Sequence, residues 1–158
     1  MRSAGIAVTV KTRRRPTTYL VIIDDSSGLP VIVKSEIFPS DATDNATQLH
    51  DTAEAVRSCL SGEAIDTAIV RRADRPPRPN SKGGPKHRLL MEGAVASAAR
   101  SVVVKTLIGT GADTGAWFGS DKNGVDLAAA QLLAEQGMPS KFAEATSAAL
   151  AALRMPWA

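Results

Sequence analysis

Lysine and arginine are concentrated in one stretch of the chain, residues 71–88, which reads RRADRPPRPNSKGGPKHR. This stretch contains seven Lys or Arg residues, one acid (Asp74), four prolines and two glycines. Because Pro and Gly interrupt both helices and strands, residues 71–88 are predicted to form a long basic loop. Clustered cations with few neighbouring acids are typical of surfaces that bind phosphates, so the chemistry expected here is phosphate binding.

A second basic cluster, KTRRR, occupies residues 11–15, although the net charge of the 158-residue chain is only +3. We expect the basic side chains of the two clusters to bind nucleic acid. The candidates are Arg13, Arg14, Arg15, Arg71, Arg72, Arg75, Arg78, Lys82, Lys86 and Arg88. With aromatic residues at only 4%, base stacking is a poor fit, and backbone contacts to duplex, hybrid or branched nucleic acid fit better. Two alternatives stay open: a solvated loop, and a loop that docks on an acidic protein or joins subunits of a homo-oligomer.

The strands and helices that must position these loops are predicted from the spacing of apolar residues. Strands are predicted at Ala4–Val10, Thr18–Ile23, Val31–Phe38, Ile65–Val70 and Ser101–Ile108. Helices are predicted at Asn45–Leu60, Arg88–Arg100, Val125–Gln136 and Phe142–Leu153, and a loop at Gly109–Gly124. Short turns make the first three strands antiparallel, and the helix before the fourth predicts a parallel crossover. The prediction is one α/β domain, 1–158, with a mixed five-stranded sheet flanked by helices.

Three segments carry a resemblance to a known family: AGIAVTV at 4–10, IDTAIVRRADRP at 65–76 and KHRLLMEGAVASAA at 86–99. Together with the order of elements, they resemble the ribonuclease H-like fold, in particular the Holliday-junction resolvases of the RuvC type. The resemblance implies a nuclease whose carboxylates, at the strand ends and in the last helix, hold two divalent metal ions such as Mg²⁺.

The acids that this resemblance requires are missing at the matching positions. Residues 5–10 contain no acid, the fourth strand runs into Arg71 and Arg72, and the last helix offers Ser147. A cation at a metal position repels the metal, so the resemblance implies a catalytically degenerate module that binds nucleic acid. The alternative is a metal-dependent nuclease that draws on Asp74, Glu92 and Asp126.

Two of these three acids, Glu92 and Asp126, also have a structural interpretation. Glu92 lies four residues after Arg88, the spacing of an ion pair on one helix face. Three aspartates lie in or beside the glycine-rich segment, and we interpret them as loop and helix-cap carboxylates: Asp113, Asp121 and Asp126.

Other features of the sequence limit the class of protein to which the chain can belong. Cys59 is the only cysteine, and no apolar run approaches the roughly 20 residues of a membrane span, so a cytoplasmic protein without membrane contact is expected. Trp117 and Phe118 lie in the glycine-rich segment, where they could form a lid over the sheet or an exposed anchor for a partner.

Overall fold

Five strands form one mixed sheet in the computed structural model, which describes residues 1–10, 15–40, 42–75, 78 and 83–157. The strands are β1 (Arg2–Thr9), β2 (Thr17–Asp24), β3 (Val31–Pro39), β4 (Thr67–Arg71) and β5 (Lys105–Gly109). They lie in the order β3-β2-β1-β4-β5. The β1–β2 and β2–β3 pairs are antiparallel, and the β1–β4 and β4–β5 pairs are parallel. This arrangement confirms the predicted sheet.

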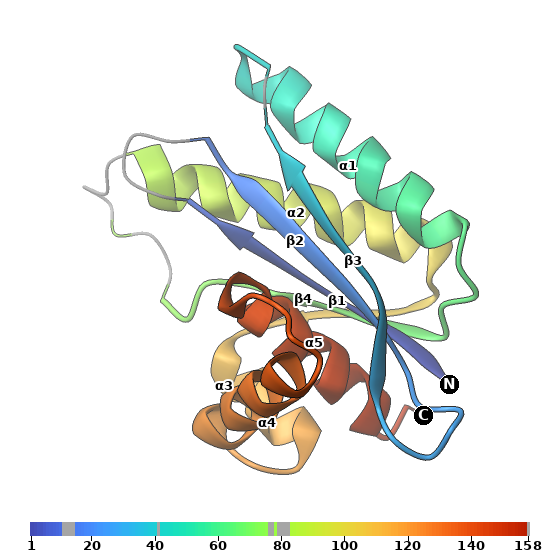
Figure 1. Cartoon of the computed structure of the whole chain (residues 1–158). Coiled ribbons are helices and arrows are strands. Elements are labelled where there is room, and N and C mark those ends of the chain that lie inside the picture. The colour runs from blue at the N-terminus through green and yellow to red at the C-terminus, as the bar shows by residue number, and fades with distance from the viewer. Residues whose placement is uncertain (11–14, 41, 76–77, 79–82, 158) are drawn as a thin grey trace.

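Helices cover both faces of the sheet (Figure 1). On one face lie α1 (Asn45–Ser61) and α2 (Gly83–Val102), whose apolar side chains pack on β1, β2 and β4. On the other lie α3 (Gly111–Phe118), α4 (Lys122–Glu135), the 3-10 helix η1 (Ser140–Phe142) and α5 (Ala143–Arg154). None of the described helices is long and apolar enough to cross a membrane.

Helix α5 packs closely on the sheet because both surfaces carry small residues at the contact. Gly5 of β1 leaves no space for a side chain, since a Cβ there would meet the backbone of Ala145 and Ala149. Ser3 Oγ donates a hydrogen bond to the Ala149 carbonyl at 2.8 Å, and Thr67 Oγ1 donates to the Ala152 carbonyl at 3.2 Å. Every residue from Ala145 to Ala152 is buried, so α5 is a core helix.

The prediction of a loop at 109–124 was wrong, because α3 forms within it. Thr110 caps α3 and forms a capping box with Asp113, and Gly119 ends the helix with a φ of 87°. The segment was predicted as a loop because it is rich in Gly, Asp and Thr, but Gly115 is required by packing: a Cβ there would meet the backbone of Asp121 and Lys122.

Two further boundaries differ from the predictions. Helix α2 begins at Gly83 and continues to Val102, so β5 begins at Lys105 instead of Ser101. Arg71 is the last residue of β4, so the connection between β4 and α2 spans only residues 72–82. The predicted basic loop at 71–88 therefore includes the end of a strand and the first turns of a helix.

Candidate nucleic-acid interface

The C-terminal end of β4 places a buried arginine beneath α4 and α5. Arg71 is only 3% exposed, and its neighbours across the sheet are Ala7 on β1 and Gly109 on β5. Its guanidinium donates to both carboxylate oxygens of Asp126 on α4, at 2.6 and 3.4 Å. Burial works to lower the pKa of Arg71, but the bonds and attraction to Asp126 outweigh it, and the net pKa is raised.

Asp126 is held by two further groups. Ser147 on α5 donates to its Oδ1 at 2.9 Å, and Lys122, one helical turn earlier on α4, contacts its Oδ2 at 3.1 Å. Burial acts to raise the pKa of Asp126, whereas Arg71, Lys122 and Ser147 stabilise the ionised form, so its pKa is lowered. The carboxylate therefore joins the end of β4 to α4 and α5 in its charged form.

The same cluster extends to the start of the basic connection through Asp74. Its Oδ1 accepts from the Gly111 amide at 2.8 Å, and its Oδ2 lies 3.8 Å from Lys122 Nζ. A Cβ on Gly111 would lie 2.7 Å from Arg71 Nη2 and from Lys122 Cε. Gly111 thus allows the two cations and Asp74 to converge at the beginning of α3. We call Arg71, Asp74, Lys122, Asp126 and Ser147 the strand-end network.

A second ion-pair cluster is built around Glu92 on α2, which is 1% exposed. Its Oε1 accepts from Arg88 Nε at 2.7 Å and from the Ala73 amide at 2.8 Å. Arg88 also reaches Glu144 on α5 at 3.1 Å. Burial is the largest influence on Glu92 and raises its pKa, although Arg88 and the Ala73 amide partly oppose this.

Two of the predicted phosphate-binding cations, Arg71 and Arg88, therefore form ion pairs with acids of the protein itself. Arg71 is buried against Asp126, which corrects its assignment to an exposed loop. Arg88 bonds to Glu92, which confirms the helical ion pair, and also to Glu144. Of the aspartates interpreted as caps, Asp113 and Asp121 do cap helices, whereas Asp126 serves the strand-end network.

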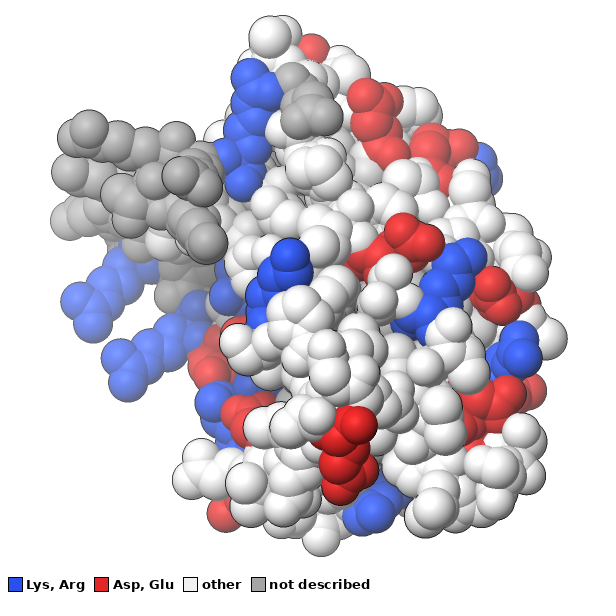
Figure 2. Space-filling model, viewed as in Figure 1, with Lys and Arg blue, Asp and Glu red and all other residues white. Residues whose placement is uncertain are grey.

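The other cations of this region are on the surface. Arg75, Arg78 and Lys86 are exposed and Arg72 is half-buried, and none of the four forms an ion pair with the residues that the structure describes. Arg15 is also exposed. Figure 2 shows Lys and Arg side chains at the margin of the molecule beside residues that are not described. The predicted contacts Arg13, Arg14 and Lys82 lie outside the described residues.

The three acids predicted as a metal site do not form one ligand set. Asp126 is bonded to Arg71 and Lys122, Asp74 also faces Lys122, and Glu92 belongs to the separate cluster with Arg88. Among the described residues, no group of three or more His, Cys, Asp and Glu side chains is placed to hold a metal ion. This donor set does not fit Mg²⁺, because two cations occupy the space around the best-placed carboxylate.

Several residues of this site were not predicted from the sequence. Lys122 could have been found, because it lies four residues before Asp126, the spacing of a helical ion pair. Glu144 and Gly111 gave no comparable signal, since their partners are distant in sequence. The aromatic pair is largely structural: Trp117 and Phe118 pack against the buried cluster of Ile69 and α5, and the Arg154 guanidinium lies 4.0 Å from the Phe118 ring centre.

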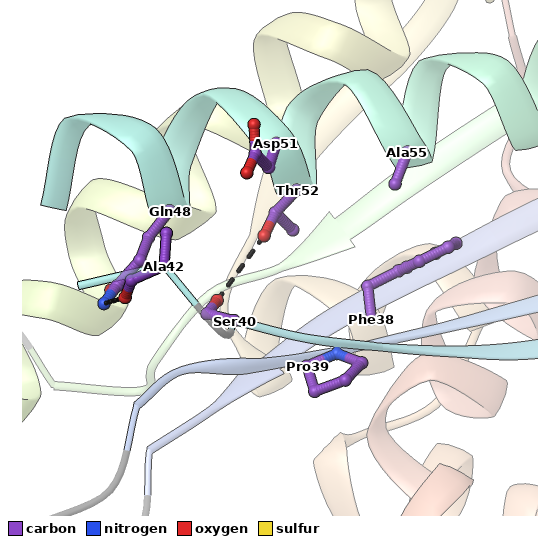
Figure 3. A pocket seen from close by; sticks show the side chains of 8 residues that line it. All are labelled: Phe38, Pro39, Ser40, Ala42, Gln48, Asp51, Thr52 and Ala55. Carbon is purple, nitrogen blue, oxygen red and sulfur yellow. Dashed lines mark hydrogen bonds between the residues drawn. The ribbon is translucent and has the colours of Figure 1, made fainter. Parts of the chain in front are cut away.

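A hollow of about 290 Å³ lies between the end of β3 and α1 (Figure 3). Three of its polar side chains contact one another or the backbone: Ser40 Oγ lies 3.5 Å from Thr52 Oγ1, and Gln48 Nε2 donates to the Ala42 carbonyl at 2.7 Å. These contacts fix the entry to α1, so we interpret the hollow as part of the scaffold.

Comparison with known proteins defines the fold. No protein-family model matches the chain, and no curated protein matches its sequence. The structure of Thermus thermophilus RuvC superposes with a TM-score of 0.69 at 17% identity, over 96% of this chain and 92% of RuvC. RuvC from the same organism, in complex with a Holliday-junction substrate, gives a TM-score of 0.65 at 16% identity, over 96% and 91%. The chain therefore has the RuvC-type ribonuclease H-like fold that the sequence resemblance predicted.

Proposed function

We propose that the chain binds duplex or branched nucleic acid through the exposed cations of the β4–α2 connection and the first turn of α2, and does not cut it by a metal-dependent mechanism. The observation that carries the proposal is the division of the basic residues. Arg71 and Arg88 are neutralised internally, but Arg75, Arg78 and Lys86 are exposed and form no ion pair with the described residues. These exposed cations are available to bind phosphates.

The base of this connection is rigid, which favours binding to a defined shape. The Arg72 amide donates to the Gly109 carbonyl at 2.8 Å, the Ala73 amide donates to Glu92, and Asp74 bonds to Gly111. Three successive residues are thus anchored to β5, α2 and α3. Anchoring of residues 72–74 reduces the conformational freedom that the start of the connection has to lose on binding. Because RuvC, with the same fold, has been solved with a Holliday junction, a branched substrate is the first to test.

The absence of metal-dependent cutting is inferred from the strand-end network. Hydrolysis by two metal ions requires carboxylates that are free to coordinate them. Here Asp126 is already bonded to Arg71, Lys122 and Ser147, and the strand beside Arg71 carries Ala7. The charge of the carboxylate is balanced by side chains of the protein, so the arrangement supports binding without catalysis.

The test is a gel-shift titration of single-stranded, duplex, RNA–DNA hybrid and four-way-junction substrates, with and without Mg²⁺. The Arg75→Ala/Arg78→Ala/Lys86→Ala variant should weaken binding about 10- to 100-fold at moderate salt. The slope of log K against log salt should decrease in magnitude by roughly 2 to 3, the value for three lost phosphate contacts.

A matched control removes three exposed cations elsewhere, Arg57, Arg100 and Lys105. Arg100 lies 14 positions after Lys86 on α2, about 21 Å along the helix axis. Equal losses in both triple variants would contradict a localised interface. Cleavage products that require Mg²⁺ and disappear in Asp126→Asn would instead support the metal-dependent nuclease. Failure of every nucleic acid to bind would leave docking on an acidic protein as the explanation of the basic residues.

A further inference from the structure

The contacts that fix the entry to α1 leave one polar side chain of the hollow beside β3 unused. The Asp51 carboxylate on α1 is exposed and forms no ion pair or hydrogen bond with the residues that the structure describes. Apolar walls come from both elements, with Phe38 on β3 and Ala55 on α1 (Figure 3). A hollow with apolar walls and one exposed carboxylate suits an alkyl chain that ends in a cation, which is the form of a lysine or arginine side chain.

The strand that forms one side of this hollow is an edge strand of the sheet. β3 lies at the end of the strand order and, within the described chain, pairs only with β2 (Figure 1). At its beginning, the Ile32 amide donates to Gln136 Oε1 at 3.2 Å. No comparable bond joins the backbone of residues 33–39 to a described residue outside β2. The outer edge of this part of β3 is therefore available to an added strand.

Successive residues of β3 present different chemistry on the two faces of the sheet. Glu36 pairs with Leu20, and Phe38 packs against the same core cluster as Leu20, so both point to the face that α1 and α2 cover. Ile37 lies between them, points to the opposite face and is 36% exposed. A strand added to β3 would therefore meet an acid on the side of α1 and apolar surface on the other side.

The charge beside this edge is acidic. Neither Glu36 nor Asp51 forms an ion pair within the part of the chain that the structure describes. Lys34 is the only basic residue of β3, and its Nζ lies 3.2 Å from Glu63 Oε1 on the same molecule. Basic side chains of a partner would thus be attracted to Glu36 and to Asp51.

We infer that β3 and the hollow bind an extended peptide in which basic and apolar residues alternate. The peptide adds a strand to the sheet, and its basic side chains point toward α1. One of them lies against Glu36, and the next, two residues along, enters the hollow and pairs with Asp51. The apolar residue between them lies against Ile37. Main-chain hydrogen bonds supply affinity, and the alternate side chains supply specificity.

The contact is small, so the dissociation constant should be on the order of 10 to 100 µM. The surface does not include the exposed cations of the β4–α2 connection. The inference therefore does not depend on nucleic-acid binding.

The test titrates the whole chain into a fluorescein-labelled peptide amide of sequence TRVRVT and follows fluorescence anisotropy. Asp51→Asn should weaken binding about tenfold, because a charge-assisted hydrogen bond in a partly enclosed hollow is lost. Glu36→Gln should weaken it about threefold, the effect of a more exposed ion pair. The control is Glu54→Gln, which changes another exposed acid of α1 that pairs with Arg57 and does not line the hollow. This variant should bind like the wild type.

Strand addition is tested separately by methylating backbone nitrogens of the peptide. The amides of successive residues in a strand point to opposite sides, so only alternate amides of the peptide can bond to β3. One peptide carries N-methyl groups on its two arginines and a second carries them on its two valines. One of these two peptides should bind at least tenfold more weakly than the other.

Several outcomes would overturn the inference. The wild-type chain would bind TRVRVT no better than the acidic peptide TEVEVT, or Asp51→Asn and Glu54→Gln would have equal effects. Equal affinities for the two methylated peptides would show electrostatic attraction without strand addition. An affinity for arginine amide equal to that for TRVRVT would show that the hollow binds a small cation and that β3 binds no strand. Circular dichroism establishes that each variant is folded.

Discussion

Arg71 and Arg72 are adjacent in the chain and identical in type, yet they have opposite environments. Arg71 is buried between the sheet and the helices and bonds to Asp126, whereas Arg72 is half-buried and forms no ion pair with the described residues. Arg71 is the last residue of β4 and points to the face of the sheet where α4 supplies Asp126, whereas Arg72 follows the end of the strand. A basic cluster in a sequence therefore combines residues that stabilise the fold with residues that can bind a partner.

The largest loss of stability is expected from removing Arg71, the buried member of this pair. Arg71→Ala should lower the free energy of unfolding by about 3 to 5 kcal/mol, because it leaves Asp126 without its main counter-ion. Arg72→Ala should change it by less than about 0.5 kcal/mol. Urea denaturation followed by circular dichroism measures both values. Similar losses in the two variants would show that the environments are less distinct than the structure indicates.

The second prediction concerns pH and compares Glu92 with Asp126. Because the pKa of Glu92 is raised in the folded protein, its contribution to stability is full below its ordinary value of 4.5 and is lost as pH rises through the folded pKa. The pKa of Asp126 is lowered, so its contribution is present above 3.8 and is lost as pH falls through its folded value.

Glu92→Gln and Asp126→Asn should therefore change the pH profile of stability in opposite directions. Relative to Glu92→Gln, the wild type should lose stability as pH rises above 4.5; relative to Asp126→Asn, it should lose stability as pH falls below 3.8. Thermal melts at one-unit pH intervals measure both differences. Parallel profiles in the two variants would contradict the opposite environments assigned to these acids.

A smaller effect is expected where α3 approaches the strand-end network. Gly111→Ala places a methyl group 2.7 Å from Arg71 Nη2 and from Lys122 Cε, and 2.8 Å from Asp74 Oδ1. Side-chain ends can shift, so the loss should be about 1 to 2 kcal/mol. Gly93→Ala on α2 is the control, because a Cβ there contacts nothing within 4 Å. Stabilisation by Gly111→Ala would show that the network is looser than described.

A smaller effect again is predicted for Lys122, whose side chain in the strand-end network is exposed. Lys122 contacts both Asp74 and Asp126, but its side chain is 43% exposed and screened by solvent. Lys122→Ala should therefore reduce stability by no more than about 1 kcal/mol, and less at high salt. Denaturant titrations at two salt concentrations measure this. A loss comparable to that of Arg71→Ala would place the centre of the network at Lys122.

Local patterns predicted most of the fold. The apolar runs in residues 4–10, 18–23 and 31–38 identified an antiparallel unit, and the helical period of 45–60 predicted the crossover to β4. Helix α3 was missed because its two glycines are needed for close packing, which no local pattern reveals. The strand-end network was missed because Arg71 finds Asp126 only after α4 is placed on the sheet, 55 residues further along the chain.

The contact between Ser3 and Ala149 joins residues 146 positions apart, and the contact between Thr67 and Ala152 joins residues 85 apart. Because α5 fills the space over β1 and β4, one face of the central strands remains uncovered while the preceding elements leave the ribosome. During synthesis, β1 and β4 therefore form before α5 is available to cover their apolar side chains on this face. Synthesis that pauses before residue 143 would therefore expose apolar strand surface to chaperones or to other nascent chains.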